Sequence, residues 1–377
     1  MYYIGNMADE KVQNRVAPQF EDFETTYPHI DFFFVDHYDI DRVSEKIENL
    51  HIIIYFGDQP PDSGLGVFFK LFTTHSNKKF IILTHHPGWA EVAPWPDNVE
   101  WVFYHCIPFS SEPVEQEYRT MDCLVDKNFD STKIGISLNR LPRKHRLCGL
   151  SYMLGAGLDE TCVITAPLLA WHLQNEQRMD LMNTIPWDFS KHDYFKHTML
   201  HGWERAKNAD GIFTVPLDAY PPYDDFEPNQ RTSCNFDNYK NRLQPLYKNS
   251  FVEFVNSSVY EYRLPWVCEK PLNSQLACNF PIFVAGRGTV QWFRNNGLDV
   301  FDDIVDHSYD LEEDPVLRLE KLVCGNQHLL SNMNKTKDLW TKHHNRFKSN
   351  VRAYWEIGDR TAIAGFDALK EWISNNG

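Results

Sequence analysis

Short, unbroken runs of apolar residues constrain the fold of this chain more than any other feature. Asp31–Asp36 (DFFFVD), His51–Phe56 (HIIIYF) and Lys79–Thr84 (KFIILT) each predict a strand that is covered on both faces. Met1–Gly5 and Glu100–His105 are expected to add two more strands. Strands of this kind occur in parallel sheets with helices on both sides.

Helical patterns separate these strands. Apolar residues recur at helical spacing over Ile40–Leu50, which predicts a helix there. Gly66–Phe72 is expected to begin another helix. The alternation of strand and helix is typical of an open parallel α/β sheet. No GxGxxG motif follows any of these strands, so the sequence does not support a dinucleotide-binding Rossmann half.

The chain has 377 residues, enough for two domains with separate cores. We expect an N-terminal α/β domain at residues 1–125, a second α/β domain at 126–335, and C-terminal helices at 336–377 that end by crossing back to the first domain. The strands expected in the second domain are Lys133–Leu138, Cys162–Ala166, Phe251–Val255 and Ile282–Ala285, with a strand and turn at Gly297–Ser308. The helices expected there and beyond are Leu147–Leu154, Phe195–Lys207, Val290–Asn296, Asp314–Asn334, Lys337–Tyr354 and Phe366–Ile373.

Composition excludes several classes of protein. The net charge of −15 disfavours a broad surface that coats nucleic acid. Eight cysteines are scattered without a CxxC motif, which indicates reduced thiols and neither a disulfide framework nor a zinc site. The N-terminus has no signal-peptide pattern, and no apolar run is long enough to span a membrane. The sequence therefore predicts a cytoplasmic protein with no membrane insertion.

A basic cluster follows the expected strand Lys133–Leu138. Arg140, Arg143 and Arg146 lie between the carboxyl end of this strand and the helix Leu147–Leu154. Helix amides and guanidinium groups at such a place favour an anion, because the forked guanidinium matches phosphate. The alternative is a solvated basic loop. Because the whole chain is acidic, a local cluster of basic residues favours the anion site over the loop.

A second polar stretch comes later in the expected second domain. Trp266–Gly286 contains Glu269 and Lys270, then a helical run, and then Pro281 with an apolar strand. An acid and a base at the start of a helix that packs under a buried strand suit a site for phosphate and ribose. A solvated start of a helix is the alternative interpretation.

The order of these features resembles the donor-binding motif of GT-B glycosyltransferases related to the α-fucosyltransferases. In that motif an Asn-Ser step, here Asn256–Ser257, precedes the Glu-Lys pair, a short helix, Pro, aliphatic residues and Gly. The basic stretch Asn139–Arg146 resembles the corresponding region in phage-encoded members. Gly297–Asp310 also resembles the group, with Leu298 in place of its usual Phe.

The resemblance implies two Rossmann-like α/β domains that face each other across a cleft, and a nucleotide-sugar as donor substrate. Arg143, Arg146 and Lys270 would neutralise the donor diphosphate, and Glu269 would hold the ribose hydroxyls. The expected donor-binding residues are Arg140, Arg143, Arg146, Asn256, Ser257, Glu269 and Lys270. No cofactor and no metal are expected. The Asp39-Ile40-Asp41 sequence is interpreted as the cap of a helix.

Acidic residues after two expected strands are candidates for the base that deprotonates the acceptor. Asp58 follows His51–Phe56, and Glu91 follows Lys79–Thr84 together with His86. Ligands of open α/β sheets bind at the carboxyl ends of strands, where a carboxylate can accept a proton from a hydroxyl. Asp58 is favoured over Glu91, and both are favoured over His86. The alternative for Asp58 is the cap of a turn, which the adjacent Pro60 and Pro61 support.

The predicted function is metal-independent transfer of a hexosyl or pentosyl group to a hydroxyl. The acceptor is either a glycan or a hydroxymethylated base in phage DNA, in which case the protein acts in the host cytoplasm. The net charge argues against DNA, whereas a basic helix at residues 335–352 leaves it open. The alternative is a non-catalytic protein of the same fold that binds nucleotide-sugars or glycans.

Overall fold

A computed structural model describes most of the chain, and the chain divides into two compact units. The described residues are 2–4, 23–35, 37–56, 65–84, 87–103, 119, 126–139, 143–166, 185, 187–208, 244–257, 259–261, 264–265, 267–268 and 270–376. The first unit comprises Met1–Glu112 with Glu356–Gly377, and the second comprises Pro113–Trp355.

The described strands of the first unit form a parallel sheet in the order β1-β2-β3-β4-β5. The strands are β1 (Tyr2–Ile4), β2 (Ile30–Val35), β3 (His51–Phe56), β4 (Lys79–Thr84) and β5 (Val99–Phe103). The helical elements of this part of the chain are α2 (Phe23–Thr26), the 3₁₀ helix η3 (His37–Lys46), α3 (Leu65–Thr74) and the 3₁₀ helix η4 (Trp89–Glu91).

One face of the first sheet is covered by the segments that connect its strands. Phe33 and Val35 of β2 lie on this face and pack with Ile40 and Val43 of η3 and Phe68 of α3. Connections between parallel strands are almost always right-handed. A sheet whose strands follow one another in sequence order therefore receives its connections on one face.

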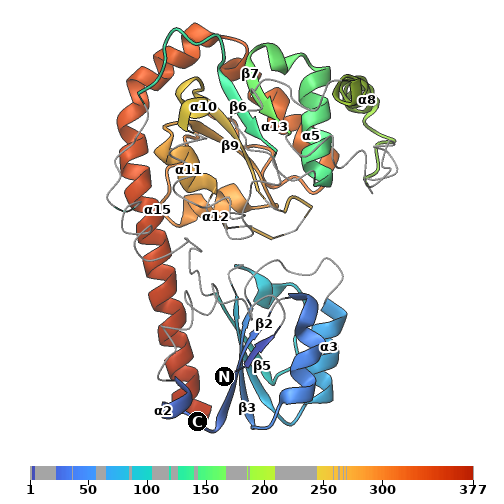
Figure 1. Cartoon of the computed structure of the whole chain (residues 1–377), viewed down its shortest axis with the longest axis vertical. Coiled ribbons are helices and arrows are strands. Elements are labelled where there is room, and N and C mark those ends of the chain that lie inside the picture. The colour runs from blue at the N-terminus through green and yellow to red at the C-terminus, as the bar shows by residue number, and fades with distance from the viewer. Residues whose placement is uncertain are drawn as a thin grey trace, which may run out of the picture. The chain divides into compact units, whose positions relative to one another are not determined.

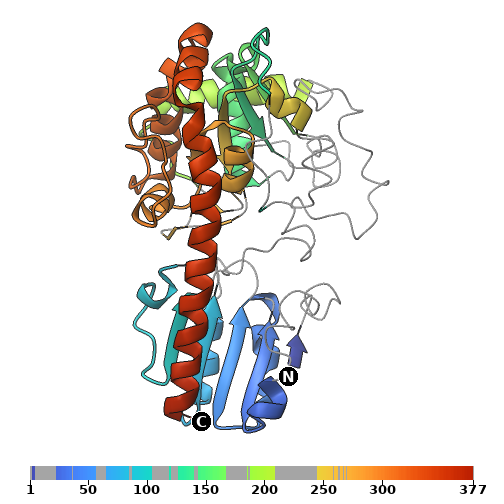
Figure 2. The same ribbon diagram turned by 90° about the vertical axis from the view of Figure 1, so that its left-hand side faces the viewer.

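The opposite face is covered by the end of the chain. Phe32 and Phe34 of β2 lie on it, and Leu369, Trp372 and Ile373 pack against this face from α15 (Met333–Asn376). Figure 2 shows the last turns of α15 running across the strands, and Figure 1 shows α3 on the other side of the sheet. Every residue of β2 is consequently buried, as its continuous apolar sequence predicts.

The described strands of the second unit form another parallel sheet, in the order β7-β6-β8-β9. The strands are β6 (Gly135–Leu138), β7 (Cys162–Thr165), β8 (Val252–Asn256) and β9 (Phe280–Val284). The other elements are α5 (Lys144–Gly155), the 3₁₀ helix η5 (Leu158–Glu160), α8 (Asp193–Asn208), α10 (Gln244–Lys248), α11 (Lys270–Leu276), α12 (Thr289–Asn295), α13 (Pro315–Gly325) and α14 (Gln327–Leu330). The prediction of two α/β domains on parallel sheets is confirmed, and two Rossmann-like units of this kind make up the GT-B fold.

Helices cover both faces of the second sheet (Figure 1). Phe254 of β8 and Ile282 of β9 share a core with α5, α8 and α13. On the other face Phe283 of β9 stacks on Phe293 of α12, with ring centroids 5.7 Å apart, and Phe293 stacks on Tyr354 of α15 at 6.1 Å. The helix α15 thus contributes to the cores of both units. Of the helices that the structure describes, none is both long and apolar enough to span a membrane.

The backbones of α5 and α8 touch where two glycines meet. A Cβ atom on Gly202 of α8 would lie 1.8 Å from the carbonyl oxygen of Ser151, and one on Gly155 of α5 would lie 1.9 Å from that of Thr198. Only glycine permits this approach at either position. The packing of α8 against α5 therefore depends on Gly155 and Gly202.

Two helices differ from the prediction. The segment Ile40–Leu50 was expected to be α-helical, but a 3₁₀ helix ends at Lys46. Ile40 and Val43 are both buried, and their spacing of three residues aligns them in a 3₁₀ helix. The helix expected at Asp314–Asn334 is divided into α13 and α14. Asn326 divides it, because its side-chain amide donates to the carbonyl oxygens of Leu322 and Asp306 at 2.9 Å each.

The segment Gly297–Ser308 contains no strand among the described residues, contrary to the prediction. Phe301 has a left-handed φ of 62°, and its carbonyl oxygen accepts bonds from Ile304 and Val305, so the chain turns there. The helices expected at Lys337–Tyr354 and Phe366–Ile373 are parts of the single helix α15.

A carboxyl group is buried within the second sheet. Glu253 of β8 is 4% exposed, and the hydroxyl of Tyr247 donates to its Oε1 at 2.9 Å. Burial raises the pKa of Glu253 to about 8, although Tyr247, Ser274 and Lys127 act in the opposite direction. Glu253 is therefore mostly protonated at neutral pH.

Replacing Gly202 by Ala should destabilise the second unit by about 3 kcal/mol, because neither backbone can retreat from the added methyl group. Gly149→Ala is the control. Its Cβ would make only an ordinary contact of 3.9 Å with Leu319, and it should gain up to about 1 kcal/mol of helix stability. Urea unfolding measures both changes. Equal stability of the two variants would contradict the close approach.

Stability should depend on pH through Glu253. Between its ordinary pKa of 4.5 and about 8, the folded chain keeps a proton that the unfolded chain releases. The free energy of unfolding should therefore fall as pH rises, by up to about 1.4 kcal/mol per pH unit. Glu253→Gln should remove this part of the slope, while Glu160→Gln, at an exposed position, should keep it. Unfolding curves at several pH values test the difference.

Candidate anion site at the second sheet

The strand order of the second sheet reverses between β6 and β8. The chain passes from β6 to the edge strand β7 and then returns to the other side of β6 as β8. Ligands of open α/β sheets bind outside the carboxyl ends of the strands at such a reversal. The relevant residues are those that follow Leu138 and Asn256. The side chain of Asn256 joins the two ends by donating to Ser137 Oγ at 3.0 Å.

The helix α5 begins at this place without any acidic residue in its first turn. Its N-cap is Arg143, whose backbone is extended (φ −70°, ψ 152°). An arginine has no acceptor, so it cannot satisfy the amides of the first turn as Ser, Thr, Asp or Asn would. Cations at a helix N-terminus also oppose the helix dipole. Arg143 and Arg146 in this turn therefore favour an anion from outside the helix.

Two side chains of α5 contact the end of β8. Arg146 donates through Nη2 to the carbonyl oxygens of Asn256 and Ser257, each at 2.9 Å. His145 Nε2 lies 3.1 Å from the same oxygen of Ser257. Because a carbonyl oxygen only accepts, Nε2 carries the proton of the neutral ring. Arg146 and His145 are 5% and 4% exposed, so both are fixed within the protein.

The surroundings of His145 are positive. Burial lowers the pKa of His145 well below its usual value, and Arg146, Arg143 and Arg318 lower it further, while the bond to Ser257 raises it. The imidazole is therefore neutral at pH 7 among three guanidinium groups. Positive charge that is concentrated among buried groups favours an anion nearby.

The start of α11 lies beside the same strand end. Cys268 Sγ is 3.7 Å from Ser257 Oγ, and Lys270 follows as the first residue of α11. Lys270 is half-buried, whereas the rest of α11 is fully buried. The structure therefore brings Arg146, Asn256 and Ser257 into contact. Lys270 follows two residues after Cys268, whose side chain contacts Ser257.

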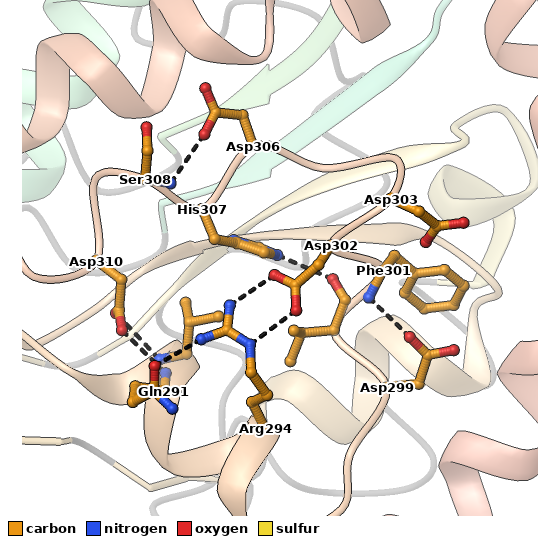
Figure 3. A network of polar contacts seen from close by, with 12 residues as sticks. Gln291, Arg294, Asp299, Phe301, Asp302, Asp303, Asp306, His307, Ser308 and Asp310 are labelled. Atoms are coloured by element: carbon orange, nitrogen blue, oxygen red, sulfur yellow. Dashed lines mark hydrogen bonds and ion pairs between the residues drawn. The ribbon is translucent and has the colours of Figure 1, made fainter.

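The N-terminus of α12, which follows β9, is closed by a residue of the protein (Figure 3). Asp310 accepts from the amide of Val290 at 3.0 Å and from that of Gln291 at 2.9 Å. Burial raises the pKa of Asp310, while these two bonds, Arg294 and Arg318 lower it. An internal carboxylate already occupies this helix end, whereas the described residues show no side-chain cap at the start of α5.

The neighbouring Tyr309 also has a structural role. The amide of Phe283 in β9 donates to its hydroxyl at 2.9 Å, and His307 Nδ1 lies 3.2 Å from the same hydroxyl. Tyr309 thus accepts a hydrogen bond from a backbone amide of β9, and Asp310 caps α12. The Tyr-Asp pair that resembles the glycosyltransferase group supports the second sheet. Figure 3 also shows Arg294 held by Asp302, with the shorter contact at 2.6 Å.

The other predicted site residues are only partly described. Asp58, His86, Arg140 and Glu269 lie outside the described residues, as does the side chain of Asp39. Glu91 is exposed at the end of η4 in the first unit, and Asp41 is also exposed. Among the residues that the structure describes, no three His, Cys, Asp or Glu side chains could together hold a metal ion.

The sequence analysis did not include His145, Tyr260 and Arg318 among the site residues. The ring of Tyr260 stacks on His145 at 5.6 Å, and Arg318 lies over Tyr260 at 4.3 Å. The sequence does mark Arg318, because a charged residue interrupts the apolar residues of α13. Tyr260 has no such signal, because its place depends on contacts between distant parts of the chain.

No protein-family model matches the sequence, and none of the curated proteins matches it. Among solved structures, the crystal structure of a glycosyltransferase from Rickettsia africae ESF-5 is similar at 12% identity and a TM-score of 0.32. The similarity covers 94% of this chain and 83% of that one. A likeness at this level assigns no activity, so a functional conclusion must come from the residues of the site.

Proposed function

We propose that this protein is a glycosyltransferase that moves a sugar from a nucleotide-sugar donor to a hydroxyl acceptor. The observation that carries the proposal is the start of α5. Arg143 is its N-cap, Arg146 and a neutral His145 contact the residues at the carboxyl end of β8, and the first helix turn holds no acid. Such a place suits a diphosphate, the leaving group of this reaction. As the glycosidic bond breaks, negative charge develops on the diphosphate, and fixed cations and helix amides stabilise it.

The donor-binding residues have distinct roles in this proposal. Arg140, Arg143 and Lys270 contact the diphosphate directly. Arg146 supports the site by fixing the carbonyl groups of Asn256 and Ser257, and the rest of its guanidinium adds positive charge. Asn256, Ser257 and Glu269 hold the ribose side of the donor. These side chains and the helix dipole perform the role that a metal ion has in other glycosyltransferases.

The acceptor is a glycan or a hydroxymethylated base of phage DNA, and the reaction takes place in the cytoplasm. The exposed basic residues Lys342, Lys348 and Arg352 of α15 favour a DNA acceptor, whereas the net charge of −15 argues against one. DNA binding through phosphates weakens steeply with salt. A gel shift of hydroxymethylcytosine duplex that disappears as salt increases would favour the DNA acceptor.

The donor site is tested by calorimetric titration with a panel of nucleotide-sugars in excess EDTA. One member should bind and be slowly hydrolysed without metal. Lys270→Ala should weaken its binding by about 2–3 kcal/mol, because a charge-assisted phosphate contact is lost. Glu269→Gln should cost less, because an amide oxygen still accepts from ribose.

The matched control is Lys248→Ala, which removes an exposed lysine of α10 in the same unit and should leave affinity unchanged. Equal affinities for wild type and Lys270→Ala would remove Lys270 from the site. Binding of no nucleotide-sugar by the wild-type protein would overturn the proposed function. Turnover that requires manganese would make Asp39 and Asp41, interpreted above as a helix cap, candidates for metal ligands.

The acceptor base is proposed to be Asp58, with Glu91 as the alternative. Asp58→Asn keeps the shape of the side chain and removes the proton acceptor, so turnover should fall about 10²–10⁴-fold with donor affinity unchanged. Glu91→Gln is the matched variant and should stay active. Single-turnover kinetics with saturating donor measures both.

Loss of turnover in Glu91→Gln alone would exchange the two roles. A wild-type protein that binds donor and transfers no sugar to any hydroxyl would instead support the non-catalytic alternative, a nucleotide-sugar or glycan-binding protein.

A further inference from the structure

Arg318 is a buried cation within the apolar side of α13. It is 3% exposed, beside Val316, Leu319 and Leu322, which belong to the core of the second unit. Its Nη1 donates to the carbonyl oxygen of Glu312 at 3.2 Å, and its Nη2 donates to the carbonyl oxygen of Tyr260. The guanidinium also interacts with the side chain of Tyr260. Burying a guanidinium group is costly, and an apolar residue would fill this side of a helix at lower cost. The charge therefore calls for a role beyond packing.

The ring of Tyr260 is the main contact of Arg318. The guanidinium lies 4.3 Å from the ring centroid, in the geometry of a cation–π interaction. The hydroxyl of Tyr260 donates to the carbonyl oxygen of Pro315 at 3.0 Å, one turn before Arg318. Tyr260 is 1% exposed, so the first turn of α13 holds both the ring and the hydroxyl of this residue.

Tyr260 in turn contacts His145. The two rings are stacked, with centroids 5.6 Å apart and planes 21° apart. The ring of Trp187 also lies against Tyr260, at 5.6 Å, and its Nε1 donates to Glu261 at 3.0 Å. His145 is thus held on its face by Tyr260 and at Nε2 by the carbonyl oxygen of Ser257.

We propose that Arg318 is a positioning residue of the anion site, which acts through Tyr260 to orient His145 at the N-terminus of α5. The inference rests on the proposed function in that the anion is the donor diphosphate. Without Arg318, the Tyr260 ring loses its cation contact and can shift from the position in which it stacks on the imidazole. The start of α5 and the carbonyl group of Ser257 would then no longer be held in one arrangement.

Arg318 also acts on His145 by its charge. Among the described residues, the charged groups that act on His145 are Arg143 and Arg146 on α5 and Arg318 on α13, and all three lower its pKa. Asp310 is close enough to Arg318 for the cation to lower the pKa of that carboxyl. Removal of Arg318 takes away one of these cations, so we expect the pKa of His145 to rise.

The test combines two measurements on the full chain. NMR titration of the imidazole, assigned with His145→Gln, gives the midpoint of His145 without any ligand. Calorimetry with inorganic pyrophosphate gives the affinity of the anion site. Arg318→Met should raise the His145 midpoint and weaken pyrophosphate binding at least tenfold at pH 7.5. Arg287→Met, which removes a cation paired with Glu313 at 2.8 Å, should leave both unchanged.

Tyr260→Leu is the second variant, for the case that Arg318→Met does not fold. It keeps the cation and removes the stacked ring, so pyrophosphate binding should again weaken at least tenfold. Tyr260→Phe keeps the ring and should bind as the wild type does. A folded Arg318→Met or Tyr260→Leu variant with the midpoint and affinity of the wild type would overturn the proposal.

The two proposals fail in different ways. A wild-type protein that binds neither pyrophosphate nor any nucleotide-sugar overturns the proposed function. The His145 midpoint is measured without ligand, and it still shows whether Arg318 acts on this imidazole. An unchanged midpoint in folded Arg318→Met, together with wild-type binding, overturns only the positioning role.

Discussion

The uncovered face of the first sheet is the constraint on which the rest of the structure depends. Strands that follow one another in sequence order place their connections on one side, here η3 and α3. Phe32 and Phe34 on the other side share a buried cluster with Leu369, Trp372 and Ile373 of α15. Burial of this apolar area is the main favourable term for such a sheet. The first unit therefore requires a helix that begins in the second.

The same helix contacts α11 and the segment before it through residues near its middle. The side chain of Asn350 donates to Gln275 of α11 at 3.0 Å, and the Tyr354 hydroxyl donates to the carbonyl oxygen of Cys268, beside Ser257. The helix that completes the first sheet thus also holds α11 in place. Changes at Asn350 or Tyr354 therefore act on the second unit, and changes at Leu369, Trp372 or Ile373 act on the first.

The sequence predicted the elements whose periodicity is strong, and it failed where side chains act on the backbone. The runs that became β2, β3 and β4 needed only continuous apolar residues. The division between α13 and α14 depends on the amide of Asn326, and the turn at Phe301 depends on a left-handed backbone, which apolar patterns do not reveal. The basic cluster was predictable because it stands out in an acidic chain. The stack of Tyr260 on His145 was not, because it joins residues far apart in sequence.

The place of Leu369, Trp372 and Ile373 in the chain has a consequence for synthesis on the ribosome. Strands β1 to β5 emerge long before the residues that cover their second face, and the whole second unit is made in between. A nascent N-terminal sheet of this kind exposes its phenylalanines until translation reaches the end of α15. Partly covered sheets are prone to aggregate. The newborn chain is thus a natural client for chaperones that shield apolar surface, and premature termination of translation would leave the first sheet permanently open.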